Sequence, residues 1–327
     1  MANLLKIALW AAAAGTSGCT ALEVLDYGLA PEDLPYASVA PRRQAPVGAA
    51  ELARVGGRLR FSSSIPRIAA ACVAQLADTE LCRDADEDGL SDAWEDLLVD
   101  RLRPFVRYHA DEPLFSTSDW LDHLTVVALA HVATARSDSS HVRVMLPFLY
   151  DKDFGRCSLE PHRGDVERVV FDLAPLGDDS MEVVGLYTAA HEYTVMDGST
   201  LLRGGDLEQM EYRKDEVTGQ PRWIVYASAA KHATYATREL CESHGVVPCQ
   251  QEGCPGASRD DRELLLAVQN AGEPPPAPVW NPFGVGMDLW GDSLFCGFAA
   301  PSNSSNEPCA PPLAEKLLKD PFEPAQR

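Results

Sequence analysis

The 327-residue sequence has few basic residues: 28 lysines and arginines stand against 49 aspartates and glutamates, giving a formal net charge of −21. A field of this sign repels phosphate backbones, which argues against nucleic acid as a partner. Beyond the N-terminal segment there is no apolar run of about 18 or more residues, so no internal transmembrane helix is expected.

The sequence also lacks the short motifs that mark common enzymes. It has no Gly-x-Ser-x-Gly elbow, Walker loop or dinucleotide-binding fingerprint. His191-Glu192 begins like a zinc-protease helix, but Val195 stands where the second histidine ligand belongs. No Cys-x-x-Cys pair occurs, which argues against a structural zinc site. These absences favour a role without catalysis.

Residues 1–18 have the pattern of a signal peptide. Lys6 supplies a positive charge, residues 7–15 form an apolar run too short to span a bilayer, and small residues lead to Cys19. A cysteine at this place resembles the lipobox of bacterial lipoproteins. The resemblance implies an exported protein that contacts the membrane through a lipid anchor on Cys19. Secretion without an anchor is the alternative.

The remaining cysteines are interpreted as disulfide partners. Nine cysteines less Cys19 leave eight, an even number that allows up to four disulfides in an exported chain. They are Cys72, Cys82, Cys157, Cys241, Cys249, Cys254, Cys296 and Cys309. If Cys72 and Cys82 pair, one straight helix cannot hold both, because ten helical residues rise about 15 Å.

Four regions follow the signal peptide in the predicted organisation. Residues 19–65 are rich in proline and predict a flexible tether. Residues 66–103 predict a helix-loop-helix, with helices over 68–81 and 91–102 and Ser91 as the N-cap of the second. Residues 104–327 predict a β-sandwich, so the fold class is mainly β. Within it, residues 240–282 predict a long disulfide-held loop. The expected strands include the runs at 124–132, 141–150, 166–173, 181–189 and 221–229.

The segment DADEDGLSDAWE, residues 84–95, matches an EF-hand-like calcium loop at every position. Calcium prefers six to eight hard oxygens, and this spacing wraps alternate side chains around one centre, with Gly89 permitting the sharp turn. The predicted ligands are Asp84, Asp86, Asp88, the Leu90 carbonyl, Asp92 and Glu95. A solvated acidic loop is the alternative.

A second acidic cluster surrounds the segment HRGDVE, residues 162–167. In an extended chain Asp165 and Glu167 point to the same face, followed by Val169 and Phe171. Oxygen ligands with imidazoles suit calcium, magnesium or manganese. The residues of this possible second site are Asp153, His162, Asp165, Glu167 and His232. Alternatively, Arg163 and Arg168 neutralise the two carboxylates in surface ion pairs.

Three segments, at 102–120, 162–171 and 223–236, resemble the vacuolar-protein-sorting-associated domain family, whose function is unassigned. The two later segments also resemble the necrosis-inducing protein family, a β-sandwich whose His-Arg-His-Asp-Trp-Glu motif lines a divalent-cation site. That resemblance implies a metal site at His162, Asp165 and Glu167, although Gly164 and Val166 depart from the motif. The first resemblance adds further candidates at His109, Asp111 and Glu112.

The leading interpretation is an exported, lipid-anchored calcium-binding protein with a non-catalytic surface or structural role. One alternative is a metal-dependent hydrolase that uses His162, Asp165 and Glu167. Another is a membrane-active, toxin-like protein. The sequence identifies no protein or lipid partner.

Overall fold

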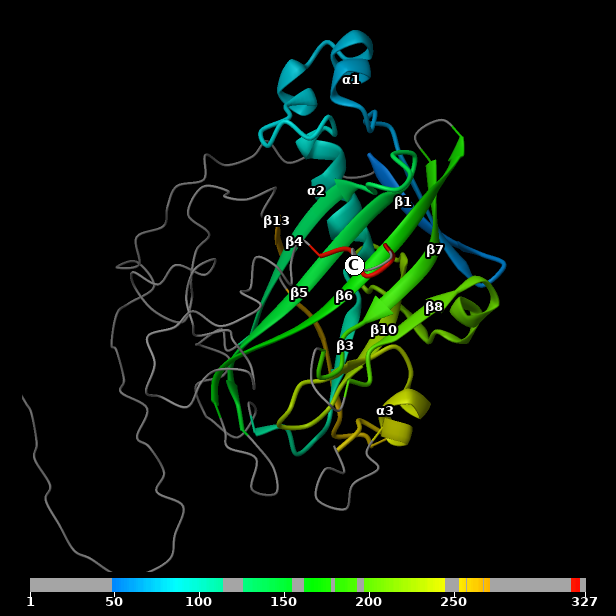
Figure 1. Cartoon of the computed structure of the whole chain (residues 1–327). Helices are drawn as coiled ribbons and strands as arrows, with labels where there is room; N and C mark the ends of the chain where they lie inside the picture. The colour runs from blue at the N-terminus through cyan, green and yellow to red at the C-terminus, as the bar shows by residue number, and fades with distance from the viewer. Residues whose placement is uncertain are drawn as a thin grey trace, which may run out of the picture. The chain divides into compact units, whose positions relative to one another are not determined.

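The structure is a computed structural model (Figure 1). It describes residues 49–113, 126–154, 162–177, 180–192, 197–244, 253–256, 258–266, 268–270 and 319–323. All of these belong to one compact unit, residues 36–327. The described part is mainly β, with two sheets and few helices. The fold class expected from the alternating runs is therefore confirmed.

The larger sheet has eight strands among the described residues, in the order β1-β2-β7-β6-β5-β4-β13, with β8 beside β7. Only the β13–β4 pair is parallel within this set. The strands are β1 Ala50–Val55, β2 Arg58–Ser63, β4 Val126–Thr134, β5 Val142–Asp153, β6 His162–Gly177, β7 Ser180–Thr188, β8 Thr200–Arg203 and β13 Val268–Asn270. Four of the five runs expected as strands therefore lie in this sheet.

The smaller sheet has the order β11-β10-β3-β12 in the described chain, with β9 beside β10. Its central pair, β3 and β10, is parallel. The strands are β3 Phe105–Tyr108, β9 Tyr212–Lys214, β10 Pro221–Ala227, β11 Thr234–Tyr235 and β12 Arg262–Leu265. The fifth expected run forms β10. The next strand after β12 is β13 of the larger sheet, so the chain passes from one sheet to the other within a few residues.

The inner faces of the two sheets share one hydrophobic core. Val169 and Phe171 of β6 belong to the same buried cluster as Trp223 and Val225 of β10. The rings of Phe171 and Trp223 stack with centroids 6.0 Å apart and planes 22° apart. This packing of two sheets through alternate inward residues is that of a β-sandwich.

The first hairpin corrects the expected extent of the tether. Residues 50–63, assigned above to a flexible segment, form β1 and β2 at the edge of the larger sheet. The two-residue turn consists of Gly56 and Gly57, whose φ angles are +57° and +84°. Glycine adopts such angles without the steric cost that other residues meet, so this pair closes a tight hairpin. Residues 19–48 lie outside the described part.

Phe61→Ala tests whether this hairpin belongs to the core. The Phe61 side chain is fully buried, with its ring edge-on to Trp94 at 5.7 Å. The substitution is expected to lower the free energy of unfolding by about 3–5 kcal/mol, since it deletes a buried ring. Urea unfolding measures the change, with the exposed neighbour Ser62→Ala as control. Equal stability of the two variants would mean that the hairpin is not packed in solution.

The helical segment differs from the expected pair of helices. Residues 68–81 do not form one helix: α1 is Ala69–Gln75, and a 3₁₀ helix, η2, follows at Thr79–Cys82. The Cys72–Cys82 disulfide, with Cα atoms 5.3 Å apart, requires this break because an unbroken helix would separate them too far. The remaining helices are α2 Asp92–Leu102, α3 Arg238–His244 and a 3₁₀ helix, η4, Gly204–Gln209. Figure 1 shows α1 and α3 at opposite ends of the long strands.

Helix α2 is the most deeply buried helix, and it contacts strands of both sheets, among them β1, β2 and β10. Ser91 occupies the N-cap position of α2, as expected, but its hydroxyl forms no hydrogen bond to the amides of the first turn. Instead, Ser91 Oγ donates to the Pro66 carbonyl at 2.9 Å. The cap therefore ties the helix to the preceding segment.

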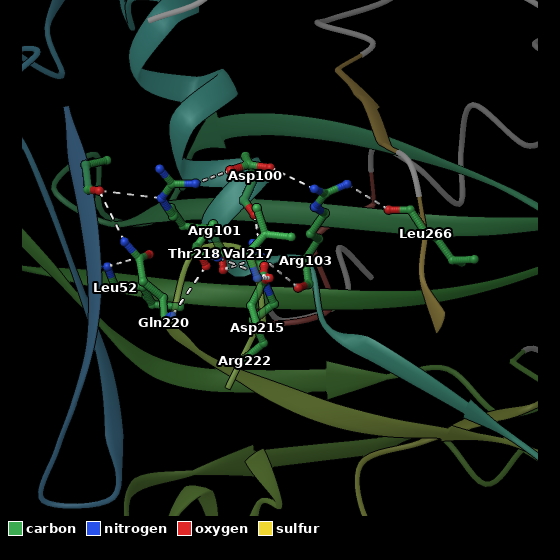
Figure 2. A network of polar contacts seen from close by, with 11 residues as sticks. Leu52, Asp100, Arg101, Arg103, Asp215, Val217, Thr218, Gln220, Arg222 and Leu266 are labelled. Atoms are coloured by element: carbon green, nitrogen blue, oxygen red, sulfur yellow. Dashed lines mark hydrogen bonds and ion pairs between the residues drawn. The ribbon is translucent and has the colours of Figure 1, made fainter. Parts of the chain in front are cut away.

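The C-terminal end of α2 is fixed by a buried arginine from β10 (Figure 2). Arg222 Nη1 donates to the carbonyls of Asp100, of Arg101 (3.0 Å) and of Arg103 (3.4 Å). Its Nε donates to Asp215 Oδ2 at 2.8 Å. A cation suits this position because the last carbonyls of a helix carry partial negative charge. Arg222 thus fastens α2 to the smaller sheet.

The expected disulfide-held loop over 240–282 is confirmed only in part. Cys241 and Cys254 form a disulfide, with Cα atoms 5.8 Å apart. Residues 262–265 and 268–270, however, are strands β12 and β13 rather than loop. The other cysteines, Cys19, Cys157, Cys249, Cys296 and Cys309, lie outside the described residues.

Residues 319–323 cover the outer face of the larger sheet, and Figure 1 shows them in red across its long strands. Asp320 accepts from Arg143 of β5 at 2.8 Å, and the Lys319 carbonyl accepts from Arg168 of β6 at 2.6 Å. Arg168 is consequently only 1% exposed. A segment near the end of the chain therefore completes the packing of the sheet.

Candidate metal centre

The loop from Asp84 to Glu95 has the internal hydrogen bonds of a tightly wound turn. Asp84 Oδ2 accepts from the Gly89 amide at 3.0 Å, and Asp88 Oδ1 accepts from the Leu90 amide at 2.7 Å. Gly89 has a φ of +93°, in the region where a side chain would be strained. This conformation explains why glycine stands at the sixth position of the loop.

The five predicted carboxylate ligands converge in the structure. Oxygen atoms of Asp84, Asp86 and Asp88 lie within 4.8 Å of one another, and so do oxygens of Asp86, Asp92 and Glu95. Asp86 belongs to both sets and so joins them into one cluster, which we call the carboxylate cluster. Leu90, whose carbonyl is the sixth predicted ligand, has a fully buried side chain, and the ligand role of its carbonyl stays a prediction.

Glu95 is the buried member of the carboxylate cluster. It lies in the first turn of α2 and is 2% exposed, and its Oε1 has no hydrogen-bond partner among the described residues. Burial first, and then repulsion from Asp88, Asp86 and Asp92, raise its pKa to about 10. Two like charges about 5 Å apart repel by roughly 3 kcal/mol at an effective dielectric of about 20. A cation bound among these carboxylates would remove this repulsion.

The ends of the loop are tied to its surroundings by backbone hydrogen bonds. The Gly89 carbonyl accepts from the Ala69 amide at 3.0 Å, and the Ser91 amide donates to the Arg67 carbonyl at 2.9 Å. The Cys72–Cys82 disulfide closes just before Asp84. The loop is consequently held at both ends before any ion binds.

The second acidic segment is part of a strand. Residues 162–167 form the beginning of β6, so Gly164 lies within the strand. Register places Tyr150 opposite Asp165 and Asp153 opposite His162 across β5 and β6. Asp165 and Glu167 share the inner face with Val169 and Phe171, as the period-two pattern predicted, and both carboxylates are buried. The side chains of Asp153 and His162 lie outside the described part.

His232 reaches Asp165, as its candidacy for the same site required. Its Nδ1 lies 3.2 Å from Asp165 Oδ2, and its Nε2 lies 3.3 Å from Glu112 Oε1. The imidazole is fully buried and stacks on Tyr150, with ring centroids 4.0 Å apart and planes 7° apart. We call His232, Asp165 and Glu112 the histidine cluster.

Glu112 of the histidine cluster was a candidate only through the first family resemblance. Its Oε2 also accepts from the Ala230 amide at 2.9 Å, so both oxygens are used. Asp111, named with it, is exposed and lies 3.8 Å from His109. Glu112 lies four residues after the end of β3, and no local sequence pattern ties it to His232.

The alternative in which Arg163 and Arg168 neutralise the two carboxylates is wrong for Arg168, whereas the side chain of Arg163 lies outside the described part. Arg168 alternates with Asp165 and Glu167 along β6 and so points to the opposite face of the sheet. It forms two hydrogen bonds to Glu192, at 2.9 and 2.6 Å. Glu192, part of the incomplete zinc-protease pattern, thus has a structural partner.

Comparison with known proteins assigns this chain to no family. No family model matches the chain, so the resemblance to the vacuolar-protein-sorting-associated domain family gains no support. No curated protein matches. A solved structure described as "Toxin fold for microbial attack and plant defense" aligns with 12% identity over 54% of this chain and 74% of that chain, with a TM-score of 0.31. An overlap this loose transfers neither a site nor an activity.

Proposed function

We propose that the carboxylate cluster binds one calcium ion, and that the protein is an exported calcium-binding protein with a structural, non-catalytic role. One observation carries this assignment: the buried Glu95 carboxylate points an unbonded oxygen at a set of converging acids. A buried charge without a partner is costly, and a divalent ion removes that cost at once.

Calcium fits the donor set better than other common ions. The predicted ligands are all oxygens, which disfavours zinc and copper. Magnesium demands a smaller, near-octahedral shell and gives up its water reluctantly. The two overlapping groups of carboxylates, with the Leu90 carbonyl as the sixth predicted ligand, would provide the larger, more flexible shell that calcium takes.

The role is structural because the ion would sit at the start of α2. That helix is buried between the sheets, with Trp94 and Leu98 fully enclosed, and its other end is held by Arg222. An ion that fixes Glu95 therefore stabilises the helix on which the adjacent core depends. A single loop of this kind in an exported protein has an expected Kd of about 10⁻⁴–10⁻³ M.

The environment proposed for the protein, outside the cytoplasm, is one in which a weak calcium site can be occupied. Two disulfides indicate an oxidising environment. No helix in the described chain is both long and apolar enough to cross a bilayer. Export and a lipid anchor on Cys19 remain part of the proposal and are supported by the sequence pattern of residues 1–19.

Calcium titration of the folded protein tests the assignment. Binding of one ion per chain is expected by calorimetry, and melting should shift upward by a few degrees. At calcium about twenty times Kd the gain in stability is about 2 kcal/mol. A chelator should reverse the shift, and magnesium at the same concentration serves as control. The same melting temperature in calcium and in chelator would refute a calcium site.

A further inference from the structure

Four neighbouring strands of the larger sheet place one residue each in a single row across its outer face. Register pairs Arg143 of β5 with Asp172 of β6. It then pairs Asp172 with Gly185 of β7, and Gly185 with Arg203 of β8. Asp172 alternates with the inward Phe171, so the row lies on the face away from the shared core. We call these four residues the arginine row.

Gly185 leaves a gap in the arginine row, and the ring of Phe322 fills it. A Cβ atom at Gly185 would lie 2.4 Å from Cε1 of that ring, closer than non-bonded carbon atoms approach. The guanidinium carbons of Arg143 and Arg203 lie over the ring, 4.9 and 5.5 Å from its centroid, as cations do at an aromatic face. Glycine in the middle of a strand weakens the strand, and the close approach of Phe322 accounts for it here.

Arg143 also binds the acid that comes two residues before the ring. Its Nε donates to Asp320 Oδ2 at 2.8 Å, its Nη1 donates to Asp172, and the side chain is only 5% exposed. The other oxygen of Asp320 accepts from the Phe322 amide at 2.8 Å, which closes a tight turn around Pro321. Proline fixes its own φ, so part of this turn is formed before the segment docks.

Two further donors of the sheet bind the ends of the segment. Arg168, which is 1% exposed, donates to the Lys319 carbonyl at 2.6 Å. The Ser137 amide donates to Glu323 Oε1 at 2.9 Å. The segment thus brings two carboxylates, a backbone carbonyl and an aromatic ring to a face that offers donors for the first three and a gap for the ring.

We propose that the arginine row and its two flanking donors form a peptide-binding site for acidic turns of the sequence Asp-Pro-Phe-Glu, and that residues 319–323 are its ligand within the chain. All the contacts described involve these five residues alone, so a separate peptide with the same residues can make every one of them. The partner that the site fits is a protein that presents such a turn. This site is independent of the proposed calcium site.

The chain's own segment sets the condition for binding a partner. A tethered segment competes with a free ligand as if it were present at roughly millimolar concentration. A partner at micromolar concentration is therefore excluded from the wild type and binds once residues 319–323 are withdrawn. Figure 1 shows where this competition takes place, since the segment crosses the long strands of the larger sheet.

Fluorescence anisotropy with a labelled peptide of residues 317–325, LLKDPFEPA, tests the proposal on full-length protein in saturating calcium. The double variant Asp320→Ala/Phe322→Ala empties the site and should bind the peptide saturably, at least about tenfold more tightly than the wild type. A peptide with the same two substitutions is the control and should not bind. Absence of binding to the double variant, or equal affinity for the wild type, would overturn the proposal.

Arg203→Gln, added to the double variant, tests where the peptide binds. Arg203 is exposed, and its loss removes one cation from the ring of the bound phenylalanine, so affinity should fall at least about threefold. The matched control is Arg54→Gln, an exposed arginine of β1 whose guanidinium lies over Tyr212 instead. Equal affinities of the two variants would mean that the peptide binds away from the arginine row.

The wild type itself carries the test if the double variant does not fold. In protein labelled with fluorophenylalanine, unlabelled peptide at about ten times the effective concentration of the segment, roughly 10 mM, should displace Phe322. Its ¹⁹F resonance, assigned by its absence in Phe322→Leu, should move to the position of fluorophenylalanine in a free peptide. A resonance that stays in place would show that the segment is a fixed part of the sheet and would refute a peptide-binding site.

Discussion

The Glu95→Gln protein is expected to lose the calcium-dependent rise in melting temperature, and also to be more stable than the wild type when calcium is absent. The two effects have opposite signs for one physical reason. The carboxylate is needed to complete the calcium shell. Without an ion it is 2% exposed among other acids, with one oxygen unbonded and its pKa raised to about 10, so folding forces it to take up a proton at neutral pH, which costs stability. The amide has the same shape and no charge.

The expected sizes follow from that reason. Loss of a charged ligand should weaken calcium binding at least tenfold, which is about 1.4 kcal/mol or more. The amide needs no proton uptake on folding, and this should raise the stability of the metal-free protein by roughly 2 kcal/mol. Calorimetric calcium titration and urea unfolding in chelator measure the two quantities independently.

Asp96→Asn is the matched control for Glu95→Gln. It removes the same charge from the next residue of α2, but Asp96 is outside the converging carboxylate set. Calcium binding should remain within a few-fold of the wild type. If Glu95→Gln and Asp96→Asn weaken binding equally, the general negative charge of this region, and not a coordinated ion, accounts for the calcium response.

Asp215→Asn is expected to lower the free energy of unfolding by about 3–5 kcal/mol, because it leaves a buried guanidinium without its carboxylate. Arg222 is 1% exposed and Asp215 is 5% exposed. Burial opposes ionisation of Asp215, but hydrogen bonds from the Val217 amide and from Arg222 lower its pKa all the same. Figure 2 shows that Arg222, which Asp215 holds, also donates to the backbone carbonyls at the end of α2.

Urea unfolding at a fixed calcium concentration measures this loss, with Glu216→Gln as control. Glu216 is the next residue, but its side chain is 83% exposed and its ion pair with Arg213 lies at the surface. Surface pairs of this kind contribute less than about 1 kcal/mol. A loss of under 1 kcal/mol for Asp215→Asn would mean that the Arg222 contacts to α2 do not need the carboxylate.

The sequence predicted those parts of the fold that depend on local periodicity. Asp165, Glu167, Val169 and Phe171 share a face because strand residues alternate, whatever the rest of the fold does. The five carboxylates of the loop converge for a similar reason, since the spacing around Gly89 sets the turn. The sequence also contains a signal for the first hairpin, because a Gly-Gly pair between two short alternating runs is typical of a hairpin. The prolines before it led to the prediction of a tether instead.

The histidine cluster could be predicted only in part. His232 and Asp165 are 67 residues apart, and His232 and Glu112 are 120 apart. They meet because β3 pairs with β10 in parallel and the smaller sheet then faces β6. Pairing between distant strands depends on the energy of the whole fold, which one segment does not encode. The placement of the two acids at opposite nitrogens of the imidazole is a property of that pairing.

The contacts of residues 319–323 have a consequence for the order in which the chain folds. The Ser137 amide donates a hydrogen bond to Glu323, 186 positions later, and the Leu52 amide donates one to Gln220, 168 positions later. Closing such long loops costs entropy before the contacts are gained, so these steps come late. Until residues 319–323 are in place, Arg143 and Arg168 lack their contacts with Asp320 and with the Lys319 carbonyl. The outer face of the larger sheet is therefore completed only after this segment has docked.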